Sequence, residues 1–214
     1  MTGAIFDLDG TLLDSMAIWD NFGADYLRAK GIVPPGDLNQ TLKPMSLPQA
    51  VDYFKAAFRL TDTPEEMMRQ FGEQIEKKYR YEVKLKPHVA EFLENLKSRN
   101  VRMCVATATA HKQAEAALKK LGIFPYFSFI LSCTEANCGK SQPEFFEQAL
   151  KRLGTEKNQT VVFEDALHAV ITAKSAGFRV VGVEDFSAGD DAEQIQSIAD
   201  FYIKNFSQWE EIAL

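Results

Sequence analysis

The stretch Ala4-Ile-Phe-Asp-Leu-Asp-Gly-Thr11 determines how the rest of the chain is interpreted. It begins with a short apolar run without helical spacing and reaches Gly10, which predicts a strand over 4–8 that ends in a turn. Residues two apart on a strand share a side, so we expect Asp7 and Asp9 to converge there. Two adjacent carboxylates repel each other unless one is protonated or a cation joins them. The pattern therefore indicates Mg²⁺, which prefers hard oxygen ligands.

From residue 87 onward, short apolar runs alternate with segments of helical spacing. We expect strands over 101–106, 127–131, 160–163, 178–183 and 201–203, and helices over 87–99, 111–121, 143–153, 166–176 and 192–198. Strands separated by helices are typical of βαβ units, so the predicted fold class is α/β, with a doubly wound parallel sheet. In such sheets, ligand-binding groups gather at the carboxyl ends of the strands.

Residues 14–84 lack a strand pattern and have the spacing of helices. The predicted helices lie over 15–30, 47–60 and 64–80. Hydroxyl residues followed three positions later by Gln or Glu, at Ser46 and Thr63, are typical capping boxes for the last two. We therefore expect a helical cap domain over 14–84, inserted after the first strand, and an α/β core made of residues 1–13 and 85–214.

Composition limits the classes of partner. The chain has 214 residues, of which 46% are hydrophobic and 25% charged, which is typical of a folded globular protein. A net charge of −6 argues against nucleic acids and anionic membranes, because phosphate backbones require clustered Lys and Arg. There is no long apolar run and no targeting pattern, so we expect a cytoplasmic protein, as a monomer or weak dimer. Three cysteines in an unpaired pattern indicate free thiols rather than a zinc site.

Chemically useful side chains also follow the later predicted strands. Thr107 and Ala108 offer a hydroxyl and a backbone amide before a helix, which suits a phosphate oxygen. Lys140 follows the next strand, and Glu164-Asp165 follows the strand after that. Taken singly, each has a simpler interpretation as a helix cap, a solvated charge or an acid at a helix start. Together they predict a phosphate site with a carboxylate free to attack.

The order of these motifs resembles a known family. The motifs are Asp7-x-Asp9-Gly-Thr11, then Thr107, then Gly139-Lys140 with Pro143, then Phe163-Glu164-Asp165 and Ala173-x-x-Ala176-Gly177. They resemble the haloacid dehalogenase (HAD) superfamily, and within it the helical-cap (subfamily I) phosphatases, which include phosphoglycolate phosphatase and β-phosphoglucomutase relatives. The resemblance spans nearly the whole chain. It is specific in the core and only architectural in the cap.

The resemblance implies roles for individual residues. Asp7 would be the nucleophile that forms an aspartyl-phosphate, and Asp9 the acid and then the base. Mg²⁺ would be held by Asp7, Asp9 through its backbone carbonyl and Asp165, with Glu164 close by or bound through water. The residues implied to bind the phosphoryl group are Thr11, Thr107, Ala108 through its amide, and Lys140. Of these, Thr107 and Lys140 would also take part in catalysis.

Some positions depart from the family pattern. Trp19 lies ten residues after Asp9, where β-phosphoglucomutases carry a His, and this weakens a mutase interpretation. Many relatives have Asn or Gly where this chain has Ala108, and Gly where it has Ala169. Neither change removes a ligand. In the cap, Trp19, Lys43 and Ser46 are candidates for substrate specificity, although packing is the simpler interpretation of Trp19 and a solvated charge that of Lys43.

These observations predict a Mg²⁺-dependent phosphatase that hydrolyses a small phosphomonoester metabolite through an aspartyl-phosphate intermediate. A phosphosugar mutase of the β-phosphoglucomutase type is the first alternative. A non-catalytic phosphate-binding relative is the second. A receiver-like signalling domain combines similar residues, but it needs only about 120 residues and has no place for the helical insertion.

Overall fold

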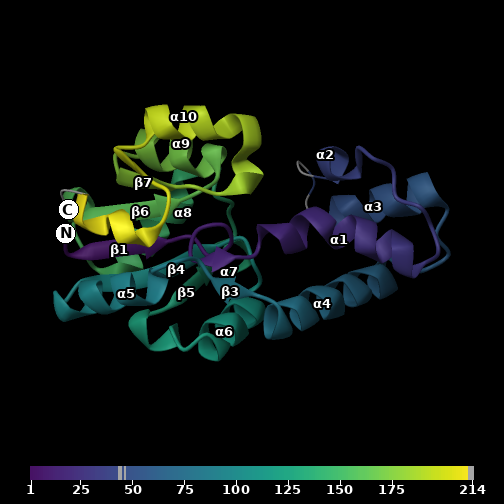
Figure 1. The fold of residues 1–214 in the computed structure, drawn as a ribbon, viewed down its shortest axis with the longest axis horizontal. Helices are drawn as coiled ribbons and strands as arrows, with labels where there is room; N and C mark the ends of the chain where they lie inside the picture. The colour runs from purple at the N-terminus through teal and green to yellow at the C-terminus, as the bar shows by residue number, and fades with distance from the viewer. Residues whose placement is uncertain (43–44, 46, 212–214) are drawn as a thin grey trace. The chain divides into compact units, whose positions relative to one another are not determined.

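The computed structural model describes residues 1–42, 45 and 47–211. Its contacts divide the chain into two compact units, Met1–Met16 with Val83–Leu214 and Ala17–Glu82. The boundaries expected from the sequence are residues 13 and 85. Figure 1 labels the helices and strands of both units. Among the described residues, no helix is long and apolar enough to cross a membrane.

A six-stranded parallel sheet forms the centre of the larger unit. Its strand order is β5-β4-β1-β6-β7-β8. The strands are β1 (Gly3–Phe6), β4 (Arg102–Thr107), β5 (Ile130–Ser132), β6 (Thr160–Glu164), β7 (Arg179–Val183) and β8 (Phe201–Ile203). In the central register, Ile5 pairs with Cys104 of β4 on one side and with Val162 of β6 on the other. The fold class predicted from the sequence, an α/β doubly wound parallel sheet, is confirmed.

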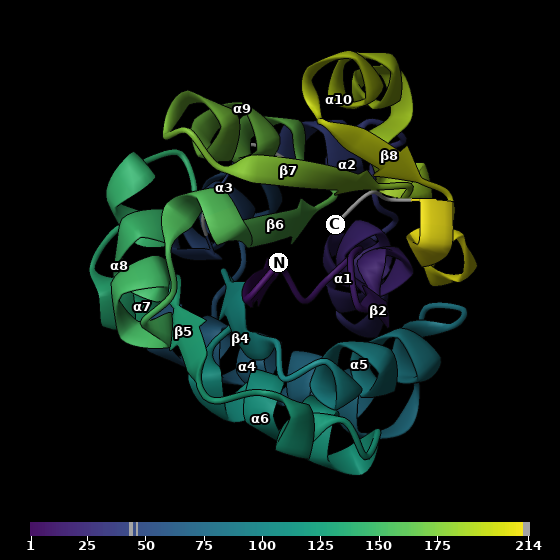
Figure 2. The ribbon, with the colours of Figure 1, turned by 90° about the vertical axis from the view of Figure 1, so that its left-hand side faces the viewer.

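Helices cover both faces of this sheet. They are α5 (Val89–Ser98), α6 (His111–Lys120), α7 (Cys133–Ala136), α8 (Pro143–Leu153), α9 (Leu167–Ser175) and α10 (Ala192–Ile198), with short 3₁₀ turns at η1 (Phe124–Tyr126), η2 (Lys157–Gln159), η3 (Phe186–Asp191) and η4 (Phe206–Glu211). Figure 2 shows α9 and α10 on one side of the sheet and α5 and α6 on the other. The helix expected from Pro87 begins at Val89, because His88 has a left-handed backbone with φ of 65°.

Successive residues of β1 point to opposite faces and are buried on both, as expected for the central strand of a parallel sheet. Ile5 belongs to an apolar cluster that includes Phe145 of α8 and Val170 of α9. Phe6 points the other way, where its ring stacks on Phe163 at a centroid distance of 4.5 Å. The core therefore lies on both sides of β1, and this packing holds the carboxyl end of the strand in place.

The smaller unit is helical. Its helices are α1 (Met16–Ala29), α2 (Leu38–Leu42), α3 (Leu47–Phe58) and α4 (Pro64–Tyr81). Their aromatic side chains pack edge to face, with Phe71 contacting Phe22 and Tyr26 at centroid distances of 4.6 Å. The capping box predicted at Thr63 is present, because its hydroxyl accepts from the Glu66 amide and the Glu66 carboxylate accepts from the Thr63 amide.

The sequence analysis missed a two-stranded antiparallel ribbon. Its strands are β2 (Leu13–Asp14) and β3 (Lys84–Leu85), at the two ends of the segment 14–84 that was expected to lack strands. Two residues per strand are too few to show an alternating pattern. Helices α2 and α7 were also not predicted, although Ser132 and Glu135 form a capping box at the start of α7.

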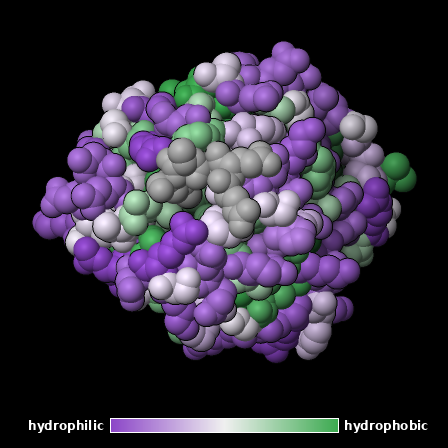
Figure 3. All heavy atoms as spheres, turned by 60° about the vertical axis from the view of Figure 1, so that its left-hand side comes forward, coloured by the Kyte–Doolittle hydropathy of each residue, from purple (hydrophilic) through white to green (hydrophobic). Residues whose placement is uncertain are grey.

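On the face drawn in Figure 3, hydrophilic side chains predominate and apolar ones are interspersed among them.

Candidate active site

The chain turns sharply where β1 ends. Asp7 extends the parallel ladder by one residue, because its amide donates to the Phe163 carbonyl at 3.0 Å. The turn then closes as the Gly10 amide donates to the Leu13 carbonyl at 2.9 Å. Gly10 has φ of 81°, and a Cβ at this position would lie 2.2 Å from Oδ2 of Asp165. Only glycine fits here, because the backbone is left-handed and the acidic side chain lies directly against it.

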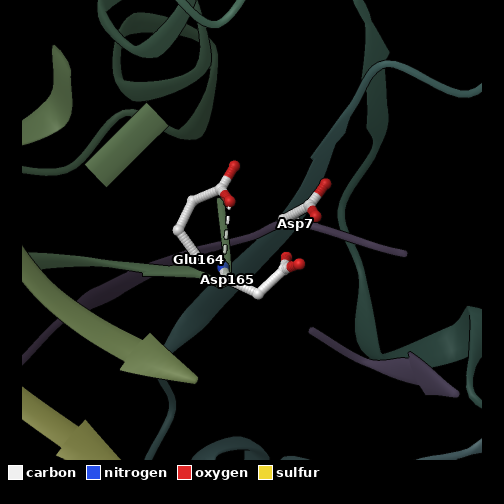
Figure 4. A group of neighbouring side chains, drawn as sticks. All are labelled: Asp7, Glu164 and Asp165. Carbon is white, nitrogen blue, oxygen red and sulfur yellow. Dashed lines mark hydrogen bonds between the residues drawn. The ribbon is translucent and has the colours of Figure 1, made fainter. Parts of the chain in front are cut away.

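Three acids meet at the carboxyl edge of the sheet. Asp7, Glu164 and Asp165 each offer a carboxylate oxygen, and these oxygens lie within 4.8 Å of one another. Because β1 and β6 are paired neighbours, the residues at their carboxyl ends are adjacent. Figure 4 shows the three side chains at these strand ends, with Asp7 and Asp165 extending to the same side. All three acids are buried.

Burial and mutual repulsion shift the pKa values of this acidic group. Burial raises the pKa of Asp7 to about 6, against the lowering effect of Lys140 and with a further increase from Glu164. Burial also raises the pKa of Asp165 well above its ordinary value, and the charges of Asp7 and Glu164 add to this increase. The site therefore favours neutralisation of its negative charge, by protons or by a cation.

Lys140 supplies a buried positive charge to the acids. Its ammonium pairs with Asp7 and lies 2.5 Å from Oε1 of Glu164. Burial alone would lower the pKa of Lys140, but the charges of Asp7 and Glu164 outweigh it and raise the pKa above its ordinary value. One ammonium among these three buried carboxylates leaves negative charge to be balanced. The oxygen donors and the excess charge together fit a hard divalent cation such as Mg²⁺.

Two of the acids are also held by hydrogen bonds. Oε2 of Glu164 accepts from the Asp165 and Ala166 amides at 3.0 and 3.1 Å, just before α9 begins. Oδ1 of Asp165 accepts from the hydroxyl of Thr11 at 2.9 Å, and Thr11 is completely buried. Both oxygens of Glu164 thus have partners within the protein. Asp165 keeps its second oxygen beside Gly10, at the turn after Asp7.

Asp9 is held separately from the three acids. Its two carboxylate oxygens accept from the hydroxyls of Ser15 and Thr109, each at 2.6 Å. Thr109 follows β4 and Ser15 follows β2, so Asp9 lies between the sheet edge and the ribbon. The sequence analysis singled out Asp9 but assigned no role to Ser15 or Thr109. The hydroxyl at 109, two residues after Thr107, was the available signal.

The end of β4 provides the hydroxyl and amide predicted there. Thr107 is its last residue and is buried, and its Oγ1 accepts from the Thr109 amide at 3.0 Å. Ala108, between them, is exposed.

Further along, Nδ1 of His111 at the start of α6 lies 2.8 Å from Oε1 of Glu135 in α7. The two residues lie on separate helices, so spacing along the chain does not pair them.

Residues 4–183 match the family model of the haloacid dehalogenase-like hydrolases. The chain belongs to this family. Over 184 residues, 86% of this chain and 85% of the relative, it is 28% identical to the phosphorylated carbohydrates phosphatase of Thermotoga maritima. It is 26% identical to the pyrophosphatase PpaX of Bacillus velezensis, also over 184 residues, which are 86% of this chain and 83% of that relative.

A solved structure agrees in fold over the whole chain. It is a Thermotoga maritima protein provisionally named a β-phosphoglucomutase, which is 26% identical and has a TM-score of 0.84. The comparison covers 99% of this chain and 100% of that one. The family resemblance expected from the sequence is confirmed, and this HAD-family protein is a hydrolase.

Substrate contacts expected for the cap of this HAD-family protein stay predictions. The indole N–H of Trp19 donates to the Tyr79 hydroxyl at 3.1 Å, and its ring packs against Phe22 in the same helical unit. These contacts match the packing role that the sequence analysis held as the simpler interpretation. Lys43 and Ser46 lie outside the described residues.

Proposed function

We propose that this HAD-family hydrolase is a Mg²⁺-dependent phosphatase that hydrolyses a small phosphomonoester metabolite through an aspartyl-phosphate. One observation carries the proposal: the buried Asp7 carboxylate lies at the carboxyl edge of the sheet, paired with Lys140 and grouped with two further acids. A carboxylate beside a fixed ammonium and a hard-cation site suits attack on phosphorus. The relatives named as phosphatases support it.

In this proposal the reaction has two steps. An oxygen of Asp7 forms a bond to phosphorus while the bond from phosphorus to the ester oxygen breaks, and Asp9 gives its proton to the departing oxygen. Asp9 then takes a proton from the water that attacks the acyl phosphate, which releases phosphate and restores Asp7. The hydroxyls of Ser15 and Thr109 suit both stages, because a hydroxyl can donate to an ionised carboxylate and accept from a protonated one.

Charge balance explains the other residues. Thr107, the Ala108 amide and Lys140 would hold phosphoryl oxygens, and the ammonium offsets the repulsion between phosphate and Asp7. Mg²⁺ would be held by Asp7, the Asp9 carbonyl and Asp165. When bound, it supplies positive charge that neutralises the phosphoryl group as charge develops. Glu164 would act mainly by fixing Lys140 and the start of α9, because both of its oxygens already have partners.

The substrate class follows from the relatives and from charge. A phosphatase of phosphorylated carbohydrates among the relatives favours a small sugar phosphate, and the pyrophosphatase name makes pyrophosphate a useful competitor in the assay. The net charge of −6 favours a small metabolite over nucleic acid. We also propose a cytoplasmic location and a substrate-selecting cap over residues 14–84.

A phosphosugar mutase is the second candidate, because one similar structure carries that provisional name. Such an enzyme needs a group that couples proton transfer to the cap. Trp19 occupies the position at which the β-phosphoglucomutases carry a His. An indole neither gives nor accepts a proton at neutral pH. Hydrolysis is therefore favoured over transfer to a second sugar oxygen.

The test measures phosphate release from an aryl phosphate, sugar phosphates and pyrophosphate, with Mg²⁺ or with EDTA. We expect release from at least one ester with Mg²⁺, none with EDTA, and loss of at least about 100-fold in kcat for Asp7→Asn. Asp190→Asn, an exposed acid, is the control and should keep the wild-type rate. Full activity in Asp7→Asn would remove the nucleophile assignment, and turnover only with an added sugar bisphosphate would favour the mutase.

A further inference from the structure

A second buried ion pair lies outside the acidic group. Nζ of Lys86 is 2.8 Å from Oδ2 of Asp185, and the two side chains are only 9% and 1% exposed. The same ammonium donates to the Glu184 carbonyl at 2.5 Å. Removing two charges from water is costly, and replacing such a pair with apolar side chains often costs no stability. A buried pair at this place therefore calls for a reason other than stability.

Asp185 belongs to the functional edge of the sheet. It follows β7, whose carboxyl end lies beside that of β6, where Glu164 sits. Its other oxygen, Oδ1, accepts from the Ser187 amide at 2.9 Å and so caps the 3₁₀ turn η3. Glu184 is fixed in turn, because its amide donates to the Ile203 carbonyl at the end of β8. The Asp185 carboxylate is thus a rigid point on the sheet.

Lys86 belongs to the ribbon. It directly follows β3, and its amide donates to the Leu12 carbonyl at 2.9 Å. β3 pairs with β2, where Leu13 lies opposite Leu85. β2 is followed at once by Ser15, whose hydroxyl donates to Asp9. A continuous series of contacts therefore runs from Asp185 through the ribbon to Asp9.

The pair adds a directional anchor to the ribbon, whose other ties include backbone hydrogen bonds to the Leu8 carbonyl. An isolated two-stranded hairpin is only marginally stable, and strands of two residues are shorter still. A charged pair with an additional carbonyl contact is directional, whereas an apolar contact is not. The pair thus fixes the ribbon in one position relative to the sheet edge. Asp9 receives one hydroxyl from each side, Thr109 from the sheet and Ser15 from the ribbon, so its position depends on that fixation.

We propose that Lys86 and Asp185 form a positioning pair that holds the β2–β3 ribbon, and through Ser15 the carboxylate of Asp9, in place for proton transfer. This inference rests on the proposed function of Asp9. It predicts that the pair matters most when the leaving group needs a proton. The leaving group of an alkyl phosphate is a strongly basic alkoxide, whereas that of an activated aryl phosphate is a weakly basic phenolate that departs without a proton.

The first measurement does not depend on activity. Amide hydrogen exchange is followed over residues 8–15 and 84–86 in wild type and Asp185→Asn. We expect faster exchange there in the variant, because the ribbon loses its anchor. The matched control is Asp200→Asn. Asp200 also pairs with a lysine, Lys174, and accepts a backbone amide, from Val180 at the amino end of β7, away from the site. Unchanged ribbon exchange in Asp185→Asn would overturn the anchoring.

The second measurement is kcat/KM for an alkyl sugar phosphate and for p-nitrophenyl phosphate. In Lys86→Met/Asp185→Leu no unpaired charge is left, so thermal stability should fall only by what the lost bonds to Ser187 and Glu184 contribute, and the variant should stay folded. We expect kcat/KM for the alkyl ester to fall at least about tenfold more than for the aryl ester, which is part of the usual contribution of general acid catalysis. Equal losses for the two esters, or wild-type values for both, would show that the pair is only structural.

Asp9→Asn is the reference for this ratio, because it removes the acid directly. If the wild type hydrolyses esters and Asp9→Asn favours the aryl ester but the double variant does not, the positioning role is wrong and the proposed function stands. If Asp9→Asn shows no preference between the esters, the proton-transfer role fails, and the inference fails with it. Asp200→Asn should leave the ratio at its wild-type value, and a changed ratio in that control would also count against the inference.

Discussion

Lys140 shows how much of this site depends on single side chains. Taken singly in the sequence it has the simpler interpretation of a solvated charge, yet the fold buries it between Asp7 and Glu164. Its charge is held firmly, because both partners raise its pKa despite burial. A buried ammonium so placed cannot be replaced by water without leaving the carboxylates unpaired. Asp165 is likewise oriented by one hydroxyl, that of Thr11, and by the absence of a side chain at Gly10.

The substitution Gly10→Ala tests the close approach at the turn. The left-handed backbone and the contact with Asp165 should together lower the free energy of unfolding by about 2–4 kcal/mol. Chemical denaturation measures this loss. Gly72→Ala is the control, because Gly72 lies within α4 and a Cβ there meets nothing within 4 Å. That change should stabilise the protein by roughly 0.5–1 kcal/mol, since alanine suits a helix better than glycine. A Gly10→Ala variant as stable as wild type would contradict the geometry.

At the scale of elements, strand ends and helix starts hold most of the described site. β1, β4 and β6 end within the same edge, so their terminal residues meet although the loops between them differ in length. The opposite edge carries structural contacts. There Asp200, just before β8, accepts from the Val180 amide of β7 and pairs with Lys174 of α9. Acid–lysine pairs thus occur at both edges of the sheet, in the candidate site at one edge and in a structural contact at the other.

Asp200 gives a pH-dependent prediction. Burial raises its pKa somewhat, but the hydrogen bonds from Lys174 and Val180 outweigh this and lower it below the ordinary 3.8. The folded state therefore prefers the ionised form, and the contribution to stability is present above the unfolded pKa and disappears as pH falls through the folded pKa. We expect Asp200→Asn to lower Tm near pH 7, and its difference from wild type to shrink as the pH falls below 3.8. Thermal unfolding across this range measures it; a difference that grows in acid would have the wrong sign.

At the scale of the whole molecule, stability and the acidic group are linked. A cation that binds only the folded state stabilises it by mass action, by about 2.7 kcal/mol at a hundred times its Kd. We expect Mg²⁺ to raise Tm in wild type, and to raise it much less in Asp165→Asn, which removes one ligand charge. Ca²⁺ and Na⁺ at equal ionic strength separate specific binding from screening. Equal stabilisation of both proteins by Mg²⁺ would place the cation elsewhere.

Several features followed from the sequence because they depend on local patterns. Apolar spacing predicted the succession of the six sheet strands and of the longer helices along the chain, and the helices over 143–153 and 192–198 begin and end where expected. The placement of Asp7 and Glu164-Asp165 at strand ends also followed, since each is defined by the strand before it, whereas Lys140 lies beyond β5, between α7 and α8. The family was identified from the same motifs. Their catalytic roles stay predictions until the variants are measured.

Only the tertiary structure decided which of these side chains meet. Thr11 and Asp165 are 154 positions apart, Thr109 and Asp9 are 100 apart, and Lys86 reaches Glu184 across 98. Such contacts depend on the strand order β4-β1-β6-β7, which spacing along the chain does not record, and on how closely the predicted turn at Gly10 approaches Asp165. Local periodicity reports which face of an element is buried, whereas a hydrogen bond requires two elements to be placed to within a fraction of an ångström. The sequence therefore determined the elements and their chemical groups, and the packing of the sheet determined their partners.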